Sequence, residues 1–363
     1  MDFTRDETET EVSALAAQVL GAIAGPDAAA HGGSAGHADC DQAGWRELGR
    51  AGLLSLALPA ELGGDGLGVQ ATAAVLTEIG RHAARMPALA TLGCGVLPVA
   101  RSAGAGLRRQ LLAGVASGDT ILTAAIREPS DPMPSVPGTV VSPAGTVTGV
   151  KTGVCYAAAA RWILVPASSA AGPVVTVVEP DADGLSCQRT RSSSGLPEYT
   201  LRLDQTPVLH VLDGCAVSDL YQLAVAGACA LADGVLAAAL ELTTAHVRTR
   251  EQFGRPLATF QAVAGQIADV YAAARTLHLA ALSACWQLDT GRAAGRDTDV
   301  AAYWLAHYGP AAVRTCHHLH GGLGMDVSYP LHRYSALMTD LVAFVGGADD
   351  RLDRLGQREA ADS

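Results

Sequence analysis

Apolar and polar positions follow a helical period in the first third of the chain. In EVSALAAQVLGAIAG and GWRELGRAGLLSLALP the apolar residues recur every three or four positions, which is typical of amphipathic helices. Pro59 and the glycine-rich run at 61–68 interrupt the pattern and predict a loop. A further helix is predicted over QATAAVLTEIGRHAARM, and Pro87 ends or kinks it. Residues 1–118 are therefore predicted to form an N-terminal helical domain.

The pattern changes after Gly118. Short β-branched runs such as TILTAAI, RWILVPA and VVTVVEP follow one another, separated by Gly, Pro, Asp and Ser turns. This spacing is typical of an antiparallel barrel and predicts a middle β domain over residues 119–218. From residue 219 to 363 the helical period returns, with a second helix after Phe260 and a third around 299–319. The predicted fold class is therefore α+β and multi-domain, in the order helices, β-barrel, helical bundle.

Composition narrows the function classes. The formal net charge is −11, and the arginines are scattered, which argues against a nucleic-acid or anionic-membrane surface. Eight cysteines include no CxxC pair, so a zinc site or a disulfide framework is not expected, and a reduced, cytoplasmic setting fits best. The N-terminus lacks the basic start and apolar block of a signal peptide. No apolar run is expected to reach the roughly 20 residues of a membrane span.

Candidate chemistry lies in the last region. Arg250, Phe253 and Gly254 form an RxxFG pattern, and Gln261 ends the following turn. A guanidinium suits a diphosphate because its planar fork makes charge-assisted hydrogen bonds.

A second segment, HLHGGLGMDVSYPLHR, places His318 shortly before Gly321 and Gly322. Paired glycines let a backbone come close to a phosphate and expose N–H groups to it. The neighbouring His317 and His320 also invite a metal hypothesis, which the absence of a carboxylate close in sequence disfavours.

Together the two segments resemble the acyl-CoA dehydrogenase family, and WRELGRAGLLSLALPAELGGDGLG with the order of regions extends the resemblance to almost the whole chain. In that family the RxxFG element and a Gln-x-x-Gly-Gly element bind the pyrophosphate and adenine side of FAD on a neighbouring subunit. The C-terminal region would then be a four-helix bundle. The resemblance implies FAD as the cofactor, held by Arg250, Phe253, Gln261, His318, Gly321 and Gly322.

The resemblance fails at the catalytic base. Family members remove an α-proton with a carboxylate while the β-carbon loses a hydride to the flavin, and here Val345 occupies the usual base position. No catalytic residue is therefore assigned. Some members carry the base on the helix before RxxFG, but residues 221–232 contain no carboxylate. Asp349 and Asp350 are either substitute bases or first-turn acids of a helix.

The flavin-ring contacts are eroded in the same way. The family's Thr-Glu-Pro-x-x-Gly-Ser-Asp loop corresponds to residues 127–131, REPSD, without the Gly-Ser step. The later strand offers Val154, Cys155 and Tyr156 near the positions of the usual Trp or Phe and Ser or Thr. Tyr156 either stacks on a ring or is a buried aromatic of a strand.

These features resemble the non-base subunits of heterotetrameric acyl-CoA dehydrogenases, particularly bacterial enzymes for steroid side-chain CoA esters. The first hypothesis is a subunit that contributes the adenine side of the FAD site to a Glu-bearing partner in an α2β2 assembly. The implied partners are that subunit or a second copy, an acyl-CoA thioester and an electron-transfer acceptor. One alternative is a repurposed flavoenzyme of secondary metabolism that acts on a CoA or carrier-protein thioester. The other is a non-catalytic scaffold.

Overall fold

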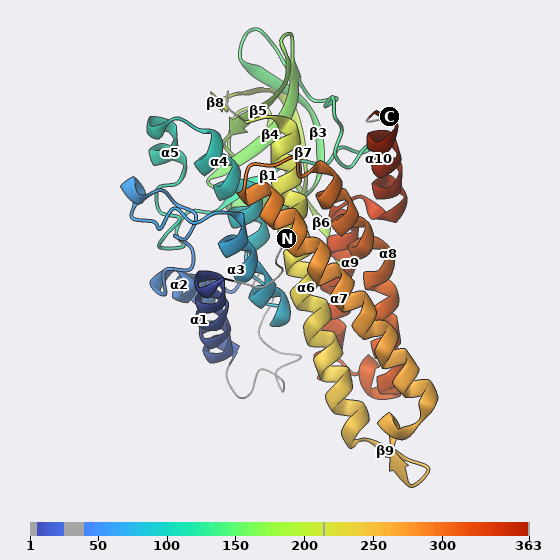
Figure 1. The fold of residues 1–363 in the computed structure, drawn as a ribbon. Coiled ribbons are helices and arrows are strands. Elements are labelled where there is room, and N and C mark those ends of the chain that lie inside the picture. Colours follow the sequence, from blue (N-terminus) through green and yellow to red (C-terminus); the bar gives the residue numbers. More distant parts are fainter. Residues whose placement is uncertain (1–5, 25–39, 213–214, 362–363) are drawn as a thin grey trace.

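The computed structural model describes residues 6–24, 40–212 and 215–361. Figure 1 shows helices at the N-terminal side, a sheet above them and a long helical bundle that extends away from the sheet. The predicted order of helices, sheet and helices is confirmed, whereas the exact domain boundaries stay predictions. The N-terminal helices are α1 (Glu7–Ala24), α2 (Gln42–Arg50), α3 (Val69–Arg81), α4 (Leu97–Ser102) and α5 (Ala105–Leu111), with a 3-10 turn η1 (Ala60–Leu62) and a π-helix η2 (Leu89–Val96).

The middle region is one mixed sheet. Its strands are β1 (Leu122–Ala124), β2 (Val140–Val141), β3 (Thr146–Cys155), β4 (Trp162–Ser169), β5 (Gly172–Val178), β6 (Leu185–Arg191), β7 (Pro197–Pro207) and β8 (His210–Val211). They follow the order β6-β7-β3-β2-β4-β5-β8, with β1 beside β4. Most pairings are antiparallel, as predicted, but β4 pairs in parallel with both β1 and β2.

The parallel pairing of β1 with β4 has a topological cause. β1 is buried at all three of its positions and enters the sheet directly from the N-terminal helices, so it lies beside β4 without a hairpin. In the described residues the hydrogen-bonded path ends at β6 and β8 and does not join them into a closed barrel. The middle region is therefore a mixed, mostly antiparallel sheet between the two helical regions.

The C-terminal region consists of α6 (Val217–Thr249), α7 (Gln261–Asp289), α8 (Gly295–His320), α9 (Leu331–Phe344) and α10 (Gly347–Ala361). Helices α6 to α9 form the predicted four-helix bundle, and α10 packs on α8. A short hairpin, β9 (Glu251–Gln252) and β10 (Arg255–Pro256), connects α6 to a 3-10 turn η4 (Leu257–Thr259) and then α7. Two further 3-10 turns are η3 (Ala157–Ala159) and η5 (Gly321–Met325).

Small residues bring α3 into close contact with α6. A Cβ on Gly80 would lie 2.0 Å from the Leu231 carbonyl oxygen, and one on Gly234 would lie 1.8 Å from the Thr77 carbonyl oxygen. The Thr77 hydroxyl donates a hydrogen bond to the Ala230 carbonyl at 3.0 Å. The N-terminal helices and the bundle therefore share one continuous core.

Helix α6 corrects one expectation. By length and composition it could cross a membrane, contrary to the expectation that no apolar run is long enough, and it is the only such helix in the described ranges. Its most apolar window has a mean hydropathy of 2.0, but 83% of that window is buried inside the protein. This burial is typical of a central core helix, because the apolar residues already contact protein.

Candidate functional site

The first motif segment forms the end of the bundle that lies farthest from the sheet (Figure 1). Arg250 follows the last residue of α6, and its side chain is exposed. The hairpin then turns at Phe253 and Gly254, which both adopt positive φ angles, 53° and 77°. This conformation is uncommon for a phenylalanine, and the residue is 93% exposed.

Aromatic contacts fix the hairpin to α7. The Arg255 guanidinium lies 4.1 Å from the centroid of the Phe260 ring, and the Phe253 ring meets Phe260 edge to face at 6.2 Å. The Leu257 backbone N–H donates to the Arg250 carbonyl at 2.9 Å. Gln261, the first residue of α7, is exposed beside this turn.

The second motif segment reaches the same end of the bundle. The His246 ring on α6 stacks on the His320 ring on α8 with 4.4 Å between centroids, which joins the ends of the two helices. His320 Nδ1 lies 2.8 Å from the Cys316 carbonyl, and its Nε2 lies 3.0 Å from the Tyr329 hydroxyl. Burial lowers the pKa of His320, so the neutral ring is favoured. The sequence singled out His320 only for a metal, and nothing in the sequence indicated its contact with His246.

His318, Gly321 and Gly322 are exposed beside this contact. Gly321 has a φ of 58°, which explains its lack of a side chain. Gly322 has no positive φ, and an added Cβ there would meet nothing within 4 Å. The chain's own packing therefore gives no reason for glycine at 322, whereas the close approach of a ligand would. Together with the exposed Arg250, which forms no ion pair within the described ranges, this fits a diphosphate-bearing cofactor.

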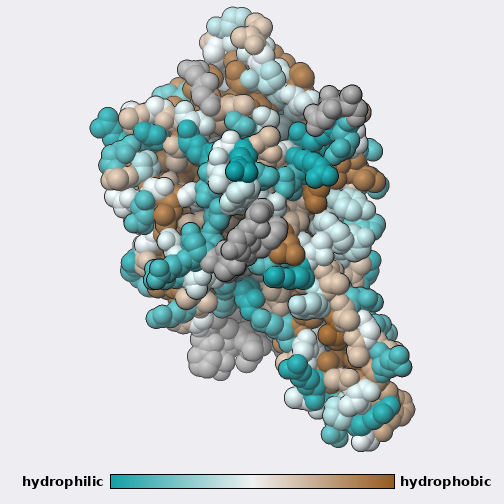
Figure 2. Space-filling model, in the orientation of Figure 1, coloured by the Kyte–Doolittle hydropathy of each residue, from teal (hydrophilic) through white to brown (hydrophobic). Residues whose placement is uncertain are grey.

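Exposed apolar side chains occur in the same two segments, and Figure 2 shows hydrophobic and hydrophilic residues side by side at this lower end of the bundle. Leu323, Met325 and Val327 follow the glycines and are 41%, 80% and 64% exposed, and Phe253 projects from the hairpin. We call the exposed set Arg250, Phe253, Gln261, His318, Gly321, Gly322, Leu323, Met325 and Val327 the bundle end.

The position predicted for a base lies inside the chain. Val345 follows α9 and is fully buried, and Gly346 and Gly347 form the next turn with φ angles of 91° and 86°. The Arg351 guanidinium donates from Nε to the Val345 carbonyl, and its Nη1 lies 3.0 Å from Asp299 Oδ1. A valine side chain takes up no proton, so this turn holds no base.

Charges near this turn are neutralised within the chain. Arg351 is 3% exposed, and burial lowers its pKa in spite of Asp299. Arg358 donates to the second oxygen of Asp299 at 2.6 Å. Asp350 accepts from Arg354 at 2.8 Å, and both Asp349 and Asp350 lie in the first turn of α10. Their place supports the interpretation as first-turn acids rather than substitute bases.

An apolar pocket lies between α3, η2, β1, the end of β3 and α9, with about 690 Å³ of empty space, part of it open to solvent. Tyr156, which is 2% exposed, and Phe344 contribute aromatic rings to its lining. Among the described residues of this lining Asp340 is the one that carries a charge, and it accepts hydrogen bonds from the backbone N–H groups of Ser193 and Ser194 at 2.7 and 2.9 Å. Its carboxylate therefore holds the 193–194 turn, and the pocket offers space for an apolar group without a free base.

The loop predicted to have lost its flavin contacts is fixed by a buried ion pair. Lys151 is fully buried and donates to Glu128 at 2.7 Å, while Thr139 donates to the same carboxylate through its N–H and its hydroxyl. Burial alone raises the pKa of Glu128, but the bonds from Lys151 and Thr139 outweigh it, and the pKa lies below its usual value. No pattern along the sequence indicated this pair.

Metal-binding geometry does not occur in the part of the chain that the structure describes, since no three His, Cys, Asp or Glu side chains come close enough together. All eight cysteines are free thiols.

Comparison with known proteins identifies relatives over the whole chain. Residues 6–119 match the model of the acyl-CoA dehydrogenase N-terminal domain, and residues 222–358 match that of the C-terminal domain. Acyl-CoA dehydrogenase FadE28 of Mycobacterium tuberculosis (strain ATCC 25618 / H37Rv) is 46% identical over 86% of this chain and 91% of its own.

Two solved assemblies are similar in sequence and fold. A variant of the Tcur3481-Tcur3483 steroid ACAD is 36% identical with a TM-score of 0.92, and the match covers 98% of this chain and 99% of that one. The ChsE4-ChsE5 complex from Mycobacterium tuberculosis is 31% identical with a TM-score of 0.90, and the match covers both chains completely.

Proposed function

The chain belongs to the acyl-CoA dehydrogenase family of CH–CH oxidoreductases, and we propose that it is the subunit without a base in an FAD-dependent α,β-desaturase. One observation carries this proposal. The polar groups of the bundle end are exposed and Arg250 forms no ion pair among the described residues, whereas Val345 is buried where a base would stand. The chain therefore keeps groups suited to a cofactor held partly by another subunit and has no base of its own.

Six residues of the bundle end have a direct role in this proposal. Arg250 binds the diphosphate with its guanidinium, and Gly321 and Gly322 let the backbone approach the phosphates. Gln261 and His318 offer hydrogen bonds to the adenosine side, while Phe253 covers it with an apolar ring. FAD, when bound, accepts the hydride from the substrate.

A partner subunit supplies the glutamate that removes the α-proton. This step of the proposal draws on the two solved relatives, which are named as assemblies of two different proteins. One of them is named a steroid ACAD, so we assign the CoA thioester of a steroid side chain as the substrate class. The partner's flavin-ring contacts replace those missing around residues 127–131 and Tyr156 of this chain.

The test is co-expression with a relative that carries the glutamate, encoded beside this chain. Flavin absorbance and desaturation of a steroid side-chain CoA ester are measured on the chain alone and on the complex. The chain alone is expected to be colourless and inactive, and the complex yellow and active. A chain that is yellow and active alone would overturn the proposal in favour of a self-sufficient flavoenzyme, and a complex without flavin would indicate a scaffold.

A further inference from the structure

One aromatic contact joins the two segments that are proposed to bind the cofactor. The ring of His246 stacks on the ring of His320 with 4.4 Å between centroids and an angle of 20° between the ring planes. His246 lies one helical turn before Arg250, whose backbone N–H donates to the His246 carbonyl at 2.8 Å. His320 is the last residue of α8 and directly precedes Gly321. Each ring is therefore attached, through a short stretch of backbone, to a residue with a proposed role at the diphosphate.

Hydrogen bonds hold the His320 ring in one orientation. The Cys316 carbonyl can only accept, so Nδ1 of His320, which lies 2.8 Å from it, carries the hydrogen. Nε2 then accepts from the Tyr329 hydroxyl at 3.0 Å. Both nitrogens of the neutral ring have partners, and the residue is 5% exposed. A ring held by one stack and two hydrogen bonds leaves the backbone at residue 320 little freedom to turn.

The loop after α8 folds back over this ring. The chain turns at Gly321, with a φ of 58°. A Cβ on Gly324 would lie 3.1 Å from the His320 Cβ, so the backbone of the loop already packs against the His320 side chain. Tyr329 ends the loop with its hydroxyl on the same ring. The position of the exposed Gly321 and Gly322 therefore depends on where His320 is held.

The surroundings of the two rings favour their neutral forms. Burial lowers the pKa of His246, and the neighbouring Arg250 lowers it further. Burial also lowers the pKa of His320; the hydrogen bond with Cys316 opposes this shift, whereas His246 and His317 add to it. Among the described residues no carboxylate forms an ion pair with either ring. A charge on either ring would be unpaired and close to Arg250, so the contact is that of two packed neutral rings.

We propose that His246 and His320 are positioning residues of the FAD site. Their stacked neutral rings hold Arg250 on α6 and the Gly321–Gly322 turn after α8 in a fixed relative position before the cofactor binds. A site that is already ordered loses less conformational freedom on binding, so its affinity is higher without any additional contact to the ligand. The inference rests on the proposed function, because it concerns how the same site keeps its shape.

Three variants of the co-expressed complex test the pair, with flavin affinity measured from absorbance under dilution. His246→Ala removes the stack and should lower the affinity about fivefold, which is the scale of one aromatic pair. His246→Phe restores a flat neutral ring and should recover most of the affinity. His246→Arg places a permanent charge against His320 and should resemble the alanine variant. If the ring served as a cation for the diphosphate, arginine would exceed phenylalanine in affinity, and this order would overturn the inference.

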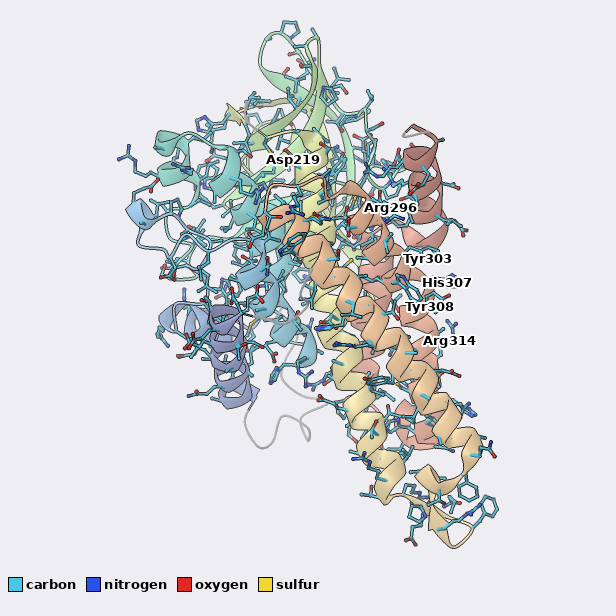
Figure 3. The ribbon with its side chains drawn as sticks, viewed as in Figure 1. Asp219, Arg296, Tyr303, His307, Tyr308 and Arg314 are labelled. Atoms are coloured by element: carbon cyan, nitrogen blue, oxygen red, sulfur yellow. The ribbon has the colours of Figure 1, made fainter. Side chains whose placement is uncertain are left out.

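A second stack on α8 provides the matched control. The rings of Tyr303 and His307 lie 5.2 Å apart, and Figure 3 shows both residues between the labelled Arg296 and Arg314. Residue 307 is roughly 20 Å along the helix from residue 320. His307→Ala should therefore leave flavin affinity unchanged. Equal losses in His307→Ala and His246→Ala would assign the effect to the general stability of the helix and would overturn the inference.

The chain alone gives a measurement that needs no cofactor. Hydrogen exchange of the 321–329 segment, followed by mass spectrometry, should be faster in His246→Ala and close to the original rate in His246→Phe. The urea midpoint of each variant establishes that the rest of the chain is folded, and His246→Arg replaces the alanine variant if that one does not fold. Unchanged exchange at 321–329 in the folded variant would overturn the inference. Flavin missing from the unmodified complex would instead overturn the proposed function.

Discussion

The arginines of the bundle end and of the turn after α9 lie in opposite environments. Arg250 is exposed without an ion pair among the described residues, whereas Arg351 is buried and pairs with Asp299. This difference distinguishes an arginine that stabilises the fold from one that binds a ligand, which the residue type alone does not do. A cation that serves the fold finds its counter-ion in the same chain, since an unpaired buried charge is costly. A cation that serves a ligand stays in water until the ligand arrives.

The largest expected effect belongs to the buried pair. Lys151→Met leaves the Glu128 carboxylate buried without its cation, and the free energy of unfolding should fall by about 3–5 kcal/mol. Urea unfolding of the purified chain measures this. The control Lys151→Met with Glu128→Gln should recover most of the loss, because no ionised group is then buried. A loss below about 1 kcal/mol for the single variant would show that the pair is not structural.

The opposite result is expected at the bundle end. Arg250→Ala removes charge-assisted hydrogen bonds to the diphosphate and should weaken flavin binding in the complex by about 1.5–3 kcal/mol. The unfolding midpoint should not change, since the side chain is exposed. Flavin retention under dilution measures the effect, with Arg275→Ala on α7 as the exposed control. Equal flavin loss in both variants would contradict a specific contact.

Gly322 gives a smaller and more selective test. Gly322→Leu meets open space in the chain itself, so folding should be unaffected, but the side chain would stand in the path of a cofactor. Flavin affinity should fall roughly tenfold, or about 1.4 kcal/mol. Gly324→Leu is the contrasting change, because a Cβ there would lie 3.1 Å from the His320 Cβ and disturb the fold. If Gly322→Leu lowered stability instead of flavin content, the glycine would belong to the fold.

Acid should reduce stability through Glu128. The folded state holds the pKa of this carboxyl below its usual value, so the pair stabilises the fold above about pH 4.5, and the benefit is lost as pH falls through the depressed pKa. In Lys151→Met the Glu128 carboxylate is buried without its cation. Its protonation at low pH removes this unpaired charge and so reduces the destabilisation of the variant. The difference in unfolding free energy between the unmodified chain and Lys151→Met should therefore become smaller as the pH falls from about 5 to 3, as measured by urea titrations. A constant difference would assign the cost of the substitution to packing.

No measurable gain is expected from Val345→Glu alone. The new carboxylate would lie beside Arg351 and lack the flavin-ring contacts around Tyr156, so desaturation by the chain without a partner should stay at background. The assay is the reduction of an artificial electron acceptor with an acyl-CoA substrate. Turnover above background would show that the inner pocket still admits both flavin and substrate.

Local sequence patterns predicted the order of the helical and sheet regions, but they did not predict contacts between residues far apart in the sequence. The position of the RxxFG segment at the end of a helix could be predicted, because the helical period and the turn residues are both local patterns of the sequence. The stack of His246 on His320 and the pairing of Lys151 with Glu128 join residues on different elements, so no spacing rule indicates them. The parallel pairing of β1 with β4 likewise depends on where the preceding helices deliver the chain. The apolar length of α6 is less evident in the sequence because small alanines separate its larger apolar residues.

The exposed apolar side chains of the bundle end carry a consequence for the life of the protein in a cell. A chain that keeps Phe253, Met325 and Val327 in water presents the kind of surface that chaperones retain and proteases degrade. Copies without a partner subunit would be degraded, whereas a bound partner subunit would cover these side chains and protect the chain. The amount of partner subunit, rather than the rate at which this chain is synthesised, would then determine how much of this chain accumulates.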